Sequence, residues 1–145
     1  MSIINSDEII KQNKLIAEFM GGKYDKDVSF PIHPDDIWLP FHGIVSYKTI
    51  EIGKGQILSY HDCWEWLMPV LEKIVRTKVG DGIVYIDYPF LRTFGAINES
   101  TGKIMVRFNG QGLFQSDTLI EATYLAVIDF ISWYNGYGNV IFKTT

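Results

Sequence analysis

The chain has 145 residues, of which 47% are hydrophobic and 14% aromatic, so it can bury a core and is not expected to be disordered. Its net charge of -4 and scattered basic residues argue against a nucleic-acid binder, which usually carries a basic face. One cysteine, Cys63, excludes an internal disulfide, and no apolar run approaches the ~20 residues of a membrane span. We therefore expect a single domain, residues 1–145, in the cytoplasm of a cell.

The first predicted element is a helix over residues 5–20. Asn5 or Ser6 can cap it. Asp7 and Glu8 come next, and their negative charges are favourable at the positive end of the helix dipole. Residues 1–11 contain these acidic residues and have neither an apolar segment nor a cleavage pattern, so we expect no secretory signal there. One side of the helix is apolar at helical spacing, formed by Ile9, Leu15, Ile16, Phe19 and Met20.

Residues 23–59 are predicted to form an irregular loop that packs on the rest of the domain. Prolines follow Phe30, His33 and Leu39 and interrupt any long helix. Residues 43–52 alternate in a way that indicates a strand, followed by a turn at residues 53–55. The segment contains many side chains that favour burial: Val28, Phe30, Ile32, Ile37, Trp38, Leu39 and Phe41. A loop of this length in a compact domain is expected to be functional or to contain a further element.

A second helix is predicted to begin at Asp62, which would cap it, with Glu65 completing a capping box. Pro69 lies inside the helix and removes one backbone hydrogen bond, so a kink or a late start is expected. The predicted core stripe consists of Trp64, Leu67, Met68, Leu71, Ile74 and Val75. Trp66 lies roughly opposite the first residue of this stripe on the helix, and is therefore left over from the core face.

The remaining residues predict a three-stranded meander and a third helix. The strands are residues 83–87, 91–97 and 103–108, and residues 98–102 have the glycine placement of a hairpin turn. The helix runs over about residues 118–134, capped by Asp117 or by the Thr118 and Glu121 pair. This order predicts the α+β class, with three helices packed on one face of a small, mainly antiparallel sheet.

Three helical segments carry a resemblance to a known group. They are NKLIAEFMG at 13–21, YHDCWEWLMPVLEKI at 60–74 and IEATYLAVIDFISWYN at 120–135, together less than half of the chain. In this order they resemble short uncharacterised phage and prophage proteins of Bacteroidota-type bacteria. That pattern has a serine and an aspartate where this chain has Cys63 and Glu65. The resemblance implies a phage-related origin and life in the host cytoplasm, and it carries over no catalytic residue.

The polar residues do not form a recognisable catalytic constellation, and we expect no metal site and no cofactor. The run His61, Asp62, Cys63 has three ligand-type side chains, but adjacent residues rarely converge on one ion. A helix start lowers the pKa of a thiol, yet a small packed cysteine explains Cys63 more simply. Residues 109–115 lead into the third helix, whose free amides suggest a small anionic ligand.

The surplus of aromatic residues gives the best functional candidates. We expect a ligand- or partner-binding role for side chains that lie beside or outside the core stripes, namely Trp66, Leu125, His61, Trp133 and Tyr137. The competing explanation is a second packing surface beneath residues 23–59. The first hypothesis is a non-enzymatic protein that binds a host or phage protein, and so modulates host defence, or that assembles with itself. The alternative is a nucleotide-like ligand in a cleft between residues 23–59 and the helices.

Overall fold

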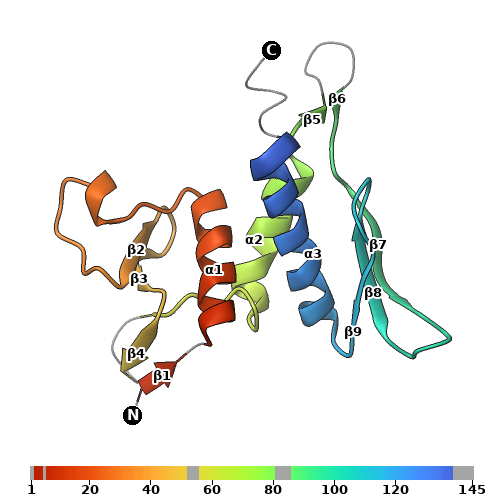
Figure 1. Ribbon diagram of the computed structural model, residues 1–145, viewed down its shortest axis with the longest axis horizontal. Coiled ribbons are helices and arrows are strands. Elements are labelled where there is room, and N and C mark those ends of the chain that lie inside the picture. Colours follow the sequence, from red (N-terminus) through yellow and green to blue (C-terminus); the bar gives the residue numbers. More distant parts are fainter. Residues whose placement is uncertain (1, 5, 52–55, 81–85, 139–145) are drawn as a thin grey trace. The chain divides into compact units, whose positions relative to one another are not determined.

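The computed structural model describes residues 2–4, 6–51, 56–80 and 86–138 (Figure 1). The chain divides into two compact units, Met1–Tyr60 and His61–Thr145, which we call unit 1 and unit 2. The described chain contains three α-helices, and all of its strand pairs are antiparallel, which confirms the predicted α+β class. The described strands form four small sheets. That the two units make a single domain stays a prediction.

The first helix of unit 1 is α1 (Asp7–Phe19), close to the predicted range. Ser6 caps it, because its Oγ accepts a hydrogen bond from the Ile9 N–H at 3.3 Å. Asn13 is buried on this helix and donates from Nδ2 to the Leu58 carbonyl oxygen at 3.2 Å. This bond links α1 to the last residues of unit 1, since a buried amide needs a partner.

Residues 23–59 are more regular than predicted. They contain the 3-10 helix η1 (Asp25–Asp27) and the antiparallel hairpin of β2 (Asp36–Leu39) and β3 (Gly43–Ser46). A further strand, β4 (Thr49–Glu51), pairs with β1 (Ser2–Ile4). The predicted strand 43–52 is therefore split in two, and its last residue and the turn at 53–55 lie outside the described residues. The sequence pattern obscured β2 because it has only four residues and is followed directly by a proline.

The packing of residues 23–59 follows the strand alternation rather than hydrophobicity alone. Ile37 and Leu39 of β2 are buried, as is Val45 of β3. Phe30 and Phe41, which were predicted to be buried, are exposed. Phe41 lies in the turn between the two strands, so the alternation that turns their side chains inward does not include it.

Unit 2 contains α2 (Trp64–Val75), β5 (Val79–Gly80), β6 (Ile86–Asp87), β7 (Leu91–Ile97), β8 (Ile104–Phe108), β9 (Phe114–Ser116), α3 (Leu119–Trp133) and the π-helix η2 (Tyr134–Gly138). A meander is present, but it consists of β7, β8 and β9. Sequence analysis missed β9 because three residues are too few to show a period. The predicted strand 83–87 lies mostly outside the described residues, and its last two residues form β6.

Helix α3 packs on the three-stranded sheet of unit 2 (Figure 1). The rings of Phe108 on β8 and Phe130 on α3 are both buried, and their centroids are 5.8 Å apart. Thr118 caps the helix, because its hydroxyl oxygen accepts a hydrogen bond from the Glu121 N–H at 3.3 Å. This confirms the predicted Thr118 and Glu121 pair rather than Asp117 as the cap. The core of unit 2 therefore lies between α3 and the buried side chains of β8.

The start and the buried face of α2 differ from the prediction. Cys63, not Asp62, is the N-cap, and it makes no side-chain cap hydrogen bond. The N–H groups of Trp66 and Leu67 instead donate to the Cys63 carbonyl oxygen, each at 3.1 Å. The helix thus begins one residue later, and the carboxylate of Asp62 lies 3.5 Å from His61 Nε2.

The buried residues of α2 are Leu67, Val70, Leu71 and Ile74. The predicted stripe is therefore rotated, since Met68 is 46% exposed and Trp64 is half-buried. Two overlapping sets of apolar residues at helical spacing run along this helix, and the spacing alone did not identify the buried set.

Replacing Leu67 and Met68 separately by alanine tests this rotation. Leu67→Ala should lower the free energy of unfolding by about 2–5 kcal/mol, because the side chain is fully buried. Met68→Ala should cost less than about 1 kcal/mol, because its side chain already contacts water. Urea denaturation measures both. Equal losses of unfolding free energy in the two variants, or a larger loss for Met68→Ala, would support the stripe predicted from the sequence instead.

Candidate functional site

The five residues singled out from the sequence all belong to unit 2. His61 precedes α2, Trp66 lies on α2, Leu125 and Trp133 lie on α3, and Tyr137 lies in η2. The first four are half-buried, whereas the side chain of Tyr137 lies outside what the structure describes.

Two of these residues make ring contacts with α3. The ring centroid of His61 is 6.2 Å from that of Tyr124, and that of Trp133 is 5.9 Å from that of Phe130. Because Tyr124 and Phe130 are buried, these contacts pack His61 and Trp133 against the core. A binding role for the five residues stays a prediction.

A different group of apolar side chains on unit 2 is exposed or half-buried. We call it the Trp64–Phe94 patch, and it consists of Trp64 and Met68 on α2 and Phe94 and Ile97 on β7. The rings of Trp64 and Phe94 meet edge to face, with centroids 6.3 Å apart and planes at 74°. Phe94 is 44% exposed and Ile97 is 55% exposed. Met68 follows Trp64 by one helical turn and so lies on the same side of α2.

The register of the sheet explains how β7 contributes to the patch. Phe94 is paired with Val106, and Ile97 with Ile104. Cross-strand partners point to the same face, and residues two apart on β8 share a face, so Phe94 and Ile97 lie on one side of the sheet. Val106 is fully buried there, whereas its partner Phe94 is exposed because β7 is an edge strand.

The edge of β7 is irregular. Its pairing with β8 shifts register between Leu91 and Thr93 and again between Phe94 and Ala96. Gly95 has φ of 93°, a conformation that suits glycine at a bulge. Bulges twist an edge strand and disturb its row of backbone donors and acceptors, which disfavours the addition of another strand. The patch is therefore suited to contact through side chains rather than through backbone pairing.

The start of α3, where an anionic ligand was predicted, already carries a carboxylate. The hydroxyl of Thr118 accepts the Glu121 N–H and lies 3.4 Å from Glu121 Oε2. This arrangement satisfies one amide and adds negative charge, both of which disfavour a bound anion. Within the described ranges, no group of three or more His, Cys, Asp or Glu side chains could hold a metal ion. No helix in the same part of the chain is long and apolar enough to cross a membrane.

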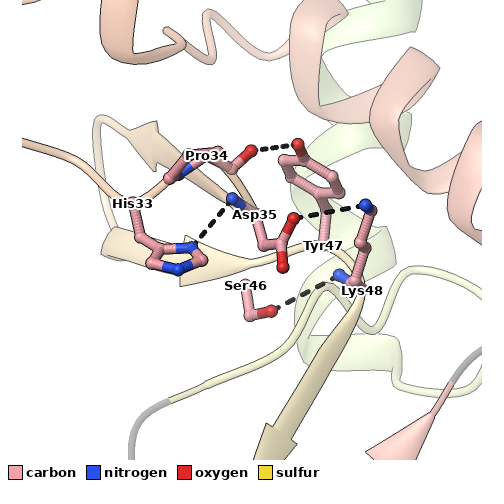
Figure 2. A network of polar contacts seen from close by, with 6 residues as sticks. All are labelled: His33, Pro34, Asp35, Ser46, Tyr47 and Lys48. Carbon is pink, nitrogen blue, oxygen red and sulfur yellow. Dashed lines mark hydrogen bonds and ion pairs between the residues drawn. The ribbon is translucent and has the colours of Figure 1, made fainter.

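Unit 1 contains a polar network at the base of the β2–β3 hairpin (Figure 2). The Tyr47 hydroxyl donates to the Pro34 carbonyl oxygen, and the Tyr47 N–H donates to the Asp35 carbonyl oxygen at 3.0 Å. The Asp35 carboxylate lies 3.2 Å from Lys48 Nζ, and the Asp35 N–H donates to His33 Nδ1 at 3.1 Å. The residues before β2 are thus tied to the residues after β3.

Tyr47 also takes part in a cation–aromatic cluster with α1. Lys14 Nζ lies 4.4 Å from the ring centroid of Tyr47 and 5.3 Å from that of Tyr24, and the two rings are at 84° to each other. The Tyr24 hydroxyl donates to Glu18 Oε2 at 2.8 Å. Burial, and then this hydrogen bond and the charge of Glu18, raise the pKa of Tyr24. Sequence analysis missed this cluster because its members are far apart in the chain and belong to different elements.

No protein-family model, curated protein or solved structure matches the chain. What the protein does must therefore be inferred from the geometry of its own residues.

The hydrogen bond of Tyr47 should contribute more to stability than the ion pair beside it. Tyr47→Phe keeps the ring beneath Lys14 but leaves the Pro34 carbonyl oxygen without this donor, so it should cost about 1–2 kcal/mol. Lys48→Gln should cost less than about 1 kcal/mol, because the pair with Asp35 is exposed to solvent. Chemical denaturation of both variants measures the difference, and a larger loss for Lys48→Gln would contradict this ranking.

The raised pKa values of Tyr24 and Tyr60 predict a loss of stability at alkaline pH. Burial is the main cause for Tyr24 and the cause for Tyr60. Below their ordinary value of 10.0 both phenols are neutral in the folded and unfolded states, so the full stability is present. Above it the unfolded phenols ionise first, and the free energy of unfolding should fall as pH rises. Denaturation at a series of alkaline pH values should show this fall, and it should be smaller in Tyr24→Phe. The same fall in that variant would assign the effect to other groups.

Proposed function

We propose that the protein is a non-enzymatic interaction module that binds another protein through the Trp64–Phe94 patch of unit 2. The observation that carries the proposal is the edge-to-face pair of Trp64 and Phe94, which are respectively half-buried and exposed. Exposed apolar area is unfavourable in water by ~25 cal/mol per Å², so a cluster of such side chains favours a partner. Tryptophan and phenylalanine are also enriched in protein interfaces.

The chemistry of the patch indicates what the partner contributes. Its four side chains are uncharged, so the surface that covers them is expected to be apolar. Since the bulged edge of β7 disfavours strand addition, the partner should present side chains from a helix or a folded loop. Met68 supports this choice, because a flexible thioether adapts to the shape of an incoming surface.

The biological setting stays a prediction. A phage or prophage origin and the modulation of host defence rest on the resemblance of the three helical segments. A nucleotide-like ligand between residues 23–59 and the helices is likewise a prediction, and no described residue adds an observation that favours it.

Phe94 on β7 and Phe90, which comes just before this strand, provide a matched pair of variants for a test. Phe94→Ser should abolish capture of a partner from a lysate of the source cells, whereas Phe90→Ser should retain it. Phe90 is 51% exposed, comparable to Phe94, but it lies outside the patch. The captured protein should then be purified, and its affinity should fall by on the order of 100-fold in Phe94→Ser, as at an interface hot spot. Both variants should unfold at similar urea concentrations. Equal affinity of the two variants would overturn the proposal.

A further inference from the structure

The tip of the β2–β3 hairpin exposes an aromatic side chain almost completely. We define the hairpin tip as Pro40, Phe41, His42, Gly43 and Ile44. Phe41 is 94% exposed, although Leu39 and Val45 on the adjoining strands are buried. The strands are therefore fixed by the core of unit 1, while the residues between them project into solvent.

Strand pairing, a proline and backbone hydrogen bonds restrict the conformation of the tip. Leu39 pairs with Gly43 across the turn, and Gly43 has φ of 74°, which a residue with a side chain rarely adopts. Pro40 restricts its own φ at the first position of the turn. Trp38 on β2 exchanges two backbone hydrogen bonds with Lys23, each at 2.8 Å. The backbone of the tip therefore loses little conformational entropy when the tip binds a partner.

The tip also carries little charge. Residues 37–47 contain no Asp, Glu, Lys or Arg, and burial lowers the pKa of His42, which keeps its imidazole mostly neutral at pH 7. The surrounding unit is acidic, with eight Asp and Glu residues against six lysines in residues 1–60. Two copies of an acidic protein repel each other through most surfaces, but not through an uncharged one.

We propose that the hairpin tip is a self-association contact in which Phe41 of one copy packs on Phe41 of a second copy. A two-fold axis places each residue near the axis against its own equivalent. A charged residue would repel itself there, whereas two phenyl rings stack with an offset. The tip is much smaller than the ~800 Å² per partner of a stable interface, so the dimer is weak and reversible, with a dissociation constant on the order of 0.1–1 mM.

Sedimentation velocity over a concentration series up to the expected dissociation constant tests the contact. The sedimentation coefficient of the wild type should rise with concentration, and that of Phe41→Ser should stay constant. Phe30→Ser is the matched control, because Phe30 is also exposed on unit 1 but lies outside the tip, and it should behave as the wild type. Since Phe41 has almost no buried area, its loss should leave the unfolding transition unchanged.

A cysteine variant identifies the residue at the contact. In a Cys63→Ser background, Phe41→Cys should form a disulfide-linked dimer under mild oxidation much faster than Phe30→Cys. Concentration-independent sedimentation of the wild type, or association that persists in Phe41→Ser, would overturn the proposal. So would Phe41-dependent flotation with phosphatidylcholine vesicles in place of self-association, which would assign the tip to a lipid surface. The comparison of Phe41→Ser with Phe30→Ser separates the tip from the Trp64–Phe94 patch, since both variants leave that patch unchanged.

Discussion

The packing of α3 on β8 is the contact on which unit 2 depends. Phe130 and Phe108 meet at its centre, and both rings are buried. Thr123 is also buried on α3, and its hydroxyl donates to the Leu119 carbonyl oxygen at 2.7 Å, so the helix satisfies its own polar group. Because β8 is fixed in this way, its partner β7 is fixed by register, and the position of Phe94 follows from that of Val106.

Unit 1 depends more on polar contacts between short elements. Its strands have only three or four residues, which is too few for a stable isolated hairpin. Asn13 supplies a buried hydrogen bond from α1, and Tyr47 supplies both a hydroxyl donor and a ring for Lys14. These contacts join segments that are far apart in sequence, so the exposed hairpin tip rests on a defined base.

The sequence predicted those parts of the fold that local chemistry determines. Ser6 and Thr118 cap their helices because the amides they bind lie three residues away. The glycine placement in residues 98–102 likewise predicted the turn between β7 and β8, where the Gly102 N–H donates to the Asn98 carbonyl oxygen. The buried face of α2 was not predictable in the same way, because two apolar sets overlap and tertiary packing selects one.

The candidate surfaces were harder to predict than the fold. Phe94 lies in a predicted strand, but its exposure depends on β7 being at the edge of the sheet. Phe41 was expected to be buried because it is apolar, and it is exposed because it falls in a turn between two strands that were not predicted as a pair. In both cases exposure is set by the pairing of strands, which hydrophobicity does not encode.

The bulges of β7 affect whether copies of this protein can aggregate through the edge of this strand. An edge strand of seven residues with exposed aromatic and aliphatic side chains has the features of a template for fibrous aggregation. Two register shifts and the backbone conformation of Gly95 remove the flat, regular edge that stacked strands need. The side chains of β7 can therefore stay exposed to solvent while the strand offers no regular edge on which a filament could grow.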